Sequence, residues 1–132
     1  CVQSEKFNYV FGLTKKDKDF YMVLERTARG ESGLVASAKV DVKNPIQLRV
    51  KGEGDGYGFY YSTDGTDFVQ LGNTVPGDIL STNVAGGFTG CLIGLYATSA
   101  NDIVVNNLNC GMCHKYGKSE FTSTDGIDYF QL

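Results

Sequence analysis

The sequence contains no tryptophan, two prolines and a single histidine among its 132 residues. It also lacks an excess of positive charge, because 12 Lys and Arg stand against 15 Asp and Glu, giving a net charge of −3. Such a balance provides no electrostatic attraction to nucleic acid or to an anionic membrane surface. No apolar run approaches the roughly 18 residues of a membrane-spanning helix. We therefore expect neither nucleic acid nor a membrane among the partners of this protein.

Glycine and aromatic residues are abundant, with 17 Gly, 8 Tyr and 8 Phe. Frequent glycine together with many aromatic residues is typical of β-sandwiches and barrels. Apolar and polar side chains alternate along residues 7–14 and 46–51, which is the period of a half-buried strand. Further strands are predicted over residues 20–27, 34–42, 91–97, 103–108 and 127–132. We predict one all-β domain over residues 1–132, an antiparallel β-sandwich of roughly eight or more strands with no helix longer than about two turns.

The segments between these strands carry the residues of turns and loops. Charged residues predict a loop at 15–19, and glycines predict loops at 27–33 and 52–56. Asp78 is placed to cap one short helical turn that extends through Ser81.

The strongest local signal is a hairpin within residues 57–71, where Asp64-Gly65 separates two β-rich runs. We expect a positive φ at Gly65, because such a turn requires it. Period-two alternation places Phe59 and Tyr61 on one face of the hairpin and Tyr60 on the other. The residues expected to pack against the rings of the buried face are Ile93, Leu95 and Phe130.

Four segments carry a resemblance to a known family when they are taken in their order along the chain. They are Tyr9–Thr14 (YVFGLT), Gly58–Gly65 (GFYYSTDG), Leu80–Gly90 (LSTNVAGGFTG) and Ile93–Thr98 (IGLYAT). Together with the closing aromatic run Asp128–Phe130, they resemble the C-terminal concanavalin A-like β-sandwich, or jelly-roll, of glycoside hydrolase family 43. This family is the β-xylosidase and α-L-arabinofuranosidase group. The resemblance covers nearly all of residues 1–98 and the last six residues, whereas we expect residues 99–126 to be an irregular insertion.

The resemblance implies a role as an accessory domain. In that family the catalytic carboxylates lie on a separate N-terminal β-propeller, so this chain looks like a non-catalytic sandwich that supports the propeller and holds xylan-type or arabinoxylan oligosaccharide. Cys1 falls where the family is already inside the domain, which implies a piece truncated at its N-terminus. We expect an extracellular or periplasmic location, with a cytoplasmic one as the alternative. The alternative role is that of an independent carbohydrate-binding module.

The acidic residues do not indicate a glycosidase site. Hydrolysis of a glycosidic bond requires two carboxylates that face each other across it. The candidates lie in turns or at strand edges, and turn formation accounts for most of them. These residues are Glu25, Glu53, Asp55, Asp64, Asp67 and Asp78. We therefore expect no glycosidase activity from this chain alone, although its parent protein would be a glycosidase.

Aromatic residues are the better candidates for contact with a sugar. A flat ring packs on the apolar face of a pyranose, and amide or carboxylate groups bind its hydroxyls. The candidates for carbohydrate binding are Tyr57, Tyr60, Asn83 and Tyr96. The competing interpretation is that the tyrosine rings complete the core or an interface with the propeller.

The four cysteines are Cys1, Cys91, Cys110 and Cys113, and Cys91 lies in an apolar run typical of a buried free thiol. The sequence Cys110-Gly-Met-Cys113-His114 has the C-x-x-C-H spacing of c-type haem attachment. No haem-wrapping helices are predicted around it, a zinc ion would lack a fourth ligand, and a redox dithiol would lack its βαβ context. A disulfide or two loop thiols is the simpler interpretation. We expect no cofactor, with haem c or zinc at Cys110, Cys113 and His114 as alternatives.

Overall fold

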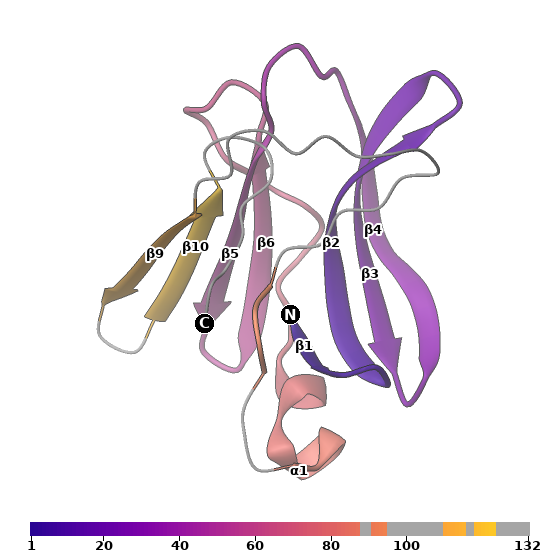
Figure 1. The fold of residues 1–132 in the computed structure, drawn as a ribbon, viewed down its shortest axis with the longest axis vertical. Coiled ribbons are helices and arrows are strands. Elements are labelled where there is room, and N and C mark those ends of the chain that lie inside the picture. The colour runs from indigo at the N-terminus through magenta and orange to yellow at the C-terminus, as the bar shows by residue number, and fades with distance from the viewer. Residues whose placement is uncertain (88–90, 95–109, 116–117, 124–132) are drawn as a thin grey trace.

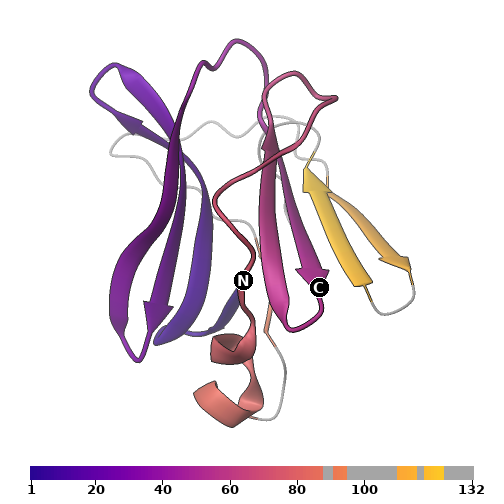
Figure 2. The same cartoon turned by 180° about the vertical axis from the view of Figure 1, so that it is seen from behind.

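The computed structural model describes residues 1–87, 91–94, 110–115 and 118–123, the last two segments as backbone only. Strands β1 to β10 form two antiparallel sheets that face each other, which confirms the predicted sandwich (Figures 1 and 2). The described part of the chain contains one short 3₁₀ turn and one short α-helix, in agreement with the predicted absence of long helices. No helix in that part has the length and apolar character needed to cross a membrane.

The first sheet, sheet A, has the strand order β1-β2-β3-β4. Its strands are β1 (Val2–Ser4), β2 (Phe7–Lys16), β3 (Asp19–Ala28) and β4 (Glu31–Val40). The second sheet, sheet B, has the order β7-β6-β5-β10-β9, and β8 also pairs with β6. Its strands are β5 (Gln47–Glu53), β6 (Gly56–Ser62), β7 (Val69–Gln70), β8 (Val75–Pro76), β9 (Cys110–Lys115) and β10 (Lys118–Ser123).

The connections in sheet A are tighter than the sequence predicts. Strands β2 and β3 are joined by Asp17-Lys18, and strands β3 and β4 by Arg29-Gly30. The loops expected at residues 15–19 and 27–33 are therefore two-residue turns, because the charged and glycine residues around them continue the strands. In the second turn both residues have positive φ, 55° at Arg29 and 83° at Gly30. Two positive φ values are the signature of a type I′ turn, whose twist matches that of the flanking strands.

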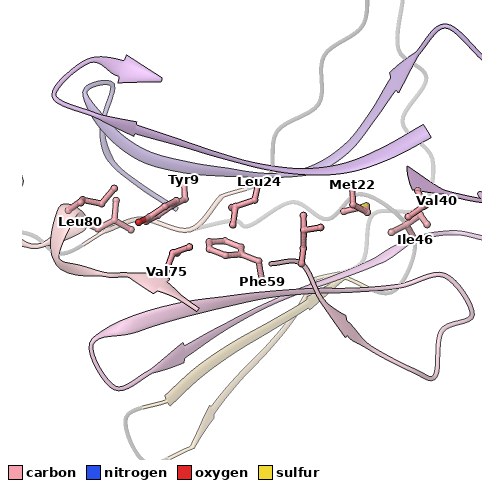
Figure 3. Close-up of a cluster of buried hydrophobic side chains, with 10 residues drawn as sticks. Tyr9, Met22, Leu24, Val40, Ile46, Phe59, Val75 and Leu80 are labelled. Atoms are coloured by element: carbon pink, nitrogen blue, oxygen red, sulfur yellow. The ribbon is translucent and has the colours of Figure 1, made fainter. Parts of the chain in front are cut away.

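The core lies between the sheets and is built from side chains of both (Figure 3). Phe59 on β6 is 1% exposed, and its ring centroid lies 5.8 Å from that of Tyr9 and 5.3 Å from that of Phe11 on β2. The predicted burial of Phe59 against the opposite sheet is thus confirmed, but its ring partners are on β2. Leu95 and Phe130, which we expected near it, lie outside the described residues.

The predicted hairpin is present, with β6 paired to β7 through Tyr60↔Gln70 and Tyr61↔Val69. Gly65 has φ +78°, as expected. The loop is wider than a two-residue turn, because its backbone N–H groups donate hydrogen bonds to the side chains of Asp64 and Ser62. Asp64 Oδ1 accepts hydrogen bonds from the Thr66 and Asp67 N–H groups, each at 2.8 Å, and from the Ser62 hydroxyl at 2.9 Å.

A short helical segment closes one end of the core. It consists of the 3₁₀ turn η1 (Asp78–Leu80) and the helix α1 (Thr82–Ala85). Asp78 Oδ1 accepts a hydrogen bond from the Ile79 N–H at 2.8 Å, consistent with the short turn predicted at this aspartate. Ile79 and Leu80 are buried, so this segment seals the space between the sheets at that end.

The rest of the chain differs in part from the sequence-based prediction. Of the strand expected at 91–97, Leu92 forms an isolated bridge with Val2 through two hydrogen bonds of 2.7 Å, and residues 95–97 lie outside the described part. Two pieces of the stretch expected to be irregular, residues 99–126, are the strands β9 and β10. Strand β10 pairs with β5 and so continues sheet B. The strands expected at 103–108 and 127–132 lie outside the described residues.

Candidate functional site

The outward face of sheet B carries a group of aromatic and charged side chains on β5, β6 and the loop before β7. The strand register pairs Arg49 with Tyr60 and Lys51 with Gly58. Val50 and Phe59, which alternate with them, point into the core, so Tyr60, Arg49 and Lys51 lie on the outer face. We refer to Arg49, Lys51, Glu53, Tyr60 and Phe68 as the outer aromatic cluster.

Tyr60 is held in place by neighbours on its own sheet. A Cβ added to Gly58 would lie 2.7 Å from Tyr60 Cε2, so the ring lies directly over this glycine. The Tyr60 hydroxyl donates to Glu53 Oε1 at 3.5 Å, and Lys51 Nζ lies 5.7 Å from the centre of the ring. A glycine at position 58 therefore makes room for an aromatic ring that lies along the strand rather than standing away from it.

Phe68 is a member of the cluster that the sequence-based reasoning did not identify. The guanidinium carbon of Arg49 lies 3.7 Å from the centre of the Phe68 ring, the geometry of a cation–π contact. The sequence does offer two signals for this pair. Arg49 occupies a water-facing position of β5, and Phe68 is the last residue of the loop between β6 and β7. What joins the two residues is the pairing of β5 with β6, which brings the loop back across the sheet.

Partial burial raises the pKa of Tyr60, and the nearby Glu53 carboxylate raises it further. Tyr60 therefore keeps its proton at neutral and moderately alkaline pH and acts as a hydroxyl donor. The cluster can offer a ring face, a hydroxyl, an ammonium and a carboxylate, which are groups that bind uncharged polar ligands.

Tyr57 lies on the other side of the sheet from Tyr60. Its ring packs against the core, and its hydroxyl oxygen is 3.4 Å from the sulfur of the half-buried free thiol Cys91. Burial and, second, the hydrogen bond with Cys91 raise the pKa of Tyr57 to about 12. The competing interpretation, in which a candidate tyrosine completes the core, thus describes the surroundings of Tyr57.

The structure does not bring the three described carbohydrate-binding candidates, Tyr57, Tyr60 and Asn83, onto one surface. Tyr57 and Tyr60 occupy opposite faces of β6. Asn83 is exposed on α1, which belongs to neither sheet, and Tyr96 lies outside the described residues. Tyr60 is the candidate that has aromatic and charged neighbours on an outer face.

Cys110, Cys113 and His114 lie on β9, a strand whose side chains are outside the described part of the molecule. Haem or zinc at these residues therefore stays an untested alternative. Among the side chains that the structure describes, no group of three or more His, Cys, Asp or Glu could hold a metal ion.

Comparison with known proteins yields one family. The family model for the β-xylosidase C-terminal concanavalin A-like domain matches residues 1–104. The match spans sheet A, strands β5 to β8 and the helical segment, and it ends before β9 and β10. No curated protein matches the chain significantly.

Proposed function

The chain belongs to the family of β-xylosidase C-terminal concanavalin A-like domains, and on that premise we propose that it is the non-catalytic accessory domain of a family-43 glycoside hydrolase. In this role it supports the catalytic β-propeller and holds xylo-oligosaccharide on its outer aromatic cluster. The observation that carries the proposal is the family match over residues 1–104, which includes most of both sheets. Since the catalytic carboxylates belong to the propeller, we expect the chain alone not to hydrolyse aryl β-xylosides.

The outer face of sheet A is the surface we assign to the catalytic domain. Three adjacent rows across β2, β3 and β4 contain one charged residue, Glu25. The rows are Asn8, Thr27 and Ser32; Val10, Glu25 and Leu34; and Gly12, Val23 and Ser37. Val10 is 42% exposed and Leu34 is 63% exposed. Few charges and exposed apolar side chains are typical of the central part of a protein–protein interface.

The outer aromatic cluster on the other sheet is the surface we assign to the sugar. The Tyr60 ring is already held over Gly58, so little side-chain freedom would be lost when a pyranose packs on it. Lys51 and Glu53 stand beside the ring and can bind sugar hydroxyls. This surface lies on the opposite side of the sandwich from the proposed docking face, so both partners can bind at once.

The two assignments are tested together by two variants. We expect Tyr60→Ala to abolish xylo-oligosaccharide binding in calorimetric titrations, with little change in melting temperature and no effect on binding to a separately produced family-43 catalytic domain. Leu34→Lys should have the opposite effect, because it places a charge in the docking face and leaves the cluster intact. Unchanged oligosaccharide binding by Tyr60→Ala would refute the sugar assignment. Weakened docking by Tyr60→Ala would make Tyr60 an interface residue instead.

The outer aromatic cluster also favours a second candidate function, that of an independent carbohydrate-binding module. The same titrations distinguish the two. A module would retain xylo-oligosaccharide and show no affinity for the catalytic domain, and Leu34→Lys would then have no effect on any binding.

A further inference from the structure

A hollow of about 550 Å³ opens at the end of the sandwich where the β3–β4 turn and the helical segment lie. Figures 1 and 2 show that turn and α1 at the same end of the molecule. The hollow is lined by Arg26, Arg29, Glu31, Asp78, Ile79 and Val84. Its volume is in the range of sites that hold small ligands. It is separate from the outer aromatic cluster on sheet B and from the proposed docking face.

Arg26 occupies a position at which the strand pattern calls for an apolar residue. On β3 the side chains of Met22 and Leu24 point into the core, and the next residue of this alternation is Arg26. The register pairs Arg26 with the buried Tyr9, which confirms that it lies on the inner face. Burial is the largest cause of the raised pKa of Tyr9. Arg26 lowers this pKa and Asp78 raises it, both by smaller amounts, which places the two charges near the Tyr9 hydroxyl. Arg26 is nevertheless exposed, so its guanidinium lies at the open mouth of the sandwich and not within the core.

Arg29 is in a backbone conformation that its side chain does not favour. Its φ of 55° lies in the left-handed region, where Asn, Asp and Gly are the residues found in type I′ turns. A residue held in such a conformation at the edge of a cavity points to a function for its side chain. Position 29 is therefore one that folding alone would fill with another residue.

Neither guanidinium forms an ion pair within the described part of the chain. The ion pairs there join Lys39 to Asp19 and Lys43 to Asp41. The planar fork of an arginine matches a carboxylate and can bind it through two hydrogen bonds. Within the described residues, the hollow thus offers two guanidinium groups that have no ion-pair partner and can bind a carboxylate.

The other residues that line the hollow indicate which class of ligand it can bind. Glu31 and Asp78 offset the charge of the two arginines, and their repulsion of a doubly charged phosphate is larger than that of a singly charged carboxylate. Carboxylates also accept hydrogen bonds from hydroxyl groups, and Ile79 supplies apolar surface for a ring. We propose that this hollow binds a uronic acid sugar, with its carboxylate on Arg26 and Arg29 and its hydroxyls toward Glu31 and Asp78. This proposal does not depend on the docking face or on the outer aromatic cluster.

The ligand class is tested by titrating the chain with sodium D-glucuronate and following backbone amide shifts by NMR. We expect shifts at residues of the hollow with a Kd of the order of millimolar, as for a small ligand with few contacts. D-Glucuronamide, which is neutral, and D-xylose should bind at least about tenfold more weakly, which corresponds to about 1.4 kcal/mol. Sodium acetate or phosphate binding as tightly as glucuronate would overturn the proposal, because the sugar would then contribute nothing.

The residues are tested by Arg29→Asn and Arg26→Gln, with Lys43→Gln as the control. Lys43 follows β4 beyond its far end, so its loss removes one positive charge at a distance from the hollow. We expect each arginine variant to weaken glucuronate binding about tenfold or more and the control to bind as the parent chain does. Arg29→Asn should also melt no lower than the parent chain, because Asn tolerates the left-handed conformation. Parent-like binding by both arginine variants would refute the proposal.

Discussion

Phe59 shows how one aromatic residue joins the two sheets. Its ring leaves β6 on the inner face, and it meets the rings of Tyr9 and Phe11 from β2 in tilted geometry. Tilted aromatic pairs add to the free energy gained from burying apolar area. Since Phe59 is 1% exposed, removal of the ring would leave a cavity between the sheets.

We expect Phe59→Ala to lower the free energy of unfolding by about 3–5 kcal/mol, because it removes buried area and leaves a cavity. A domain of this size holds only about 5–15 kcal/mol in total. Urea unfolding followed by circular dichroism measures the change. Val69→Ala on β7 is the control, since Val69 is 54% exposed and its truncation should cost no more than about 0.5 kcal/mol. Equal losses for the two variants would show that Phe59 does not carry the contact between the sheets.

The β6–β7 hairpin depends on hydrogen bonds to one carboxylate. The Asp64 carboxylate accepts hydrogen bonds from two backbone N–H groups. The Ser62 hydroxyl accepts a hydrogen bond from the Gly65 N–H at 2.9 Å and donates one to Asp64. Ser62 is 1% exposed, and these bonds explain why a polar residue can be buried there. Hydrogen bonds from Thr66, Asp67 and Ser62, in that order, hold the pKa of Asp64 below its usual value of 3.8.

A lowered pKa means that the folded chain releases this proton more readily than the unfolded chain. The stabilisation from Asp64 is therefore fully present above the usual aspartate pKa, and it is lost as the pH falls through the lower folded value. As the pH is lowered from about 5 to about 2, we expect the melting temperature of Asp64→Asn to fall by less than that of the parent chain. Asp17→Asn, in the turn between β2 and β3, removes the same charge and serves as the control. A pH profile for Asp64→Asn parallel to that of the parent chain would contradict this account.

The molecule extends beyond the region that matches its family. The match ends at residue 104, whereas sheet B continues through β10 and β9. Strand β10 pairs with β5 through Phe121↔Val50 and the residues on either side. Without β10, β5 would be an edge strand with unpaired backbone groups, and such edges pair readily with other chains.

We therefore expect a chain that ends at residue 104 to melt at a lower temperature than the full chain and to self-associate. Light scattering coupled to size-exclusion chromatography measures the association. Proline substitution at Phe121 in the full chain is the companion variant, since it disrupts the same pairing without removing the segment. A shortened chain that remains monomeric with an unchanged melting temperature would mean that β10 contributes nothing to sheet B.

Much of the architecture can be predicted from residues that are adjacent in the sequence. The alternation in residues 7–14 predicts β2 and its inner face, and Asp64-Gly65 predicts the hairpin and the positive φ of Gly65, because pleat and turn geometry depend on residues adjacent in sequence. The ends of the strands are predicted less accurately than their presence. The charged run at 15–19 continues two strands because pairing across the hairpin outweighs the local turn preference of charged residues.

The candidate sites could not be predicted from the sequence and became visible only in the folded chain. Alternation places Phe59 and Tyr60 on opposite faces, as the structure confirms, but which of those faces is covered depends on where sheet A packs. The contact of Arg49 with Phe68, and the position of Asp78 in one hollow with Arg26 and Arg29, bring together residues that are distant in sequence. Such contacts result from strand register and from the packing of one sheet on the other. Short-range sequence preferences carry no information about either, since both arise from burial summed over the whole core.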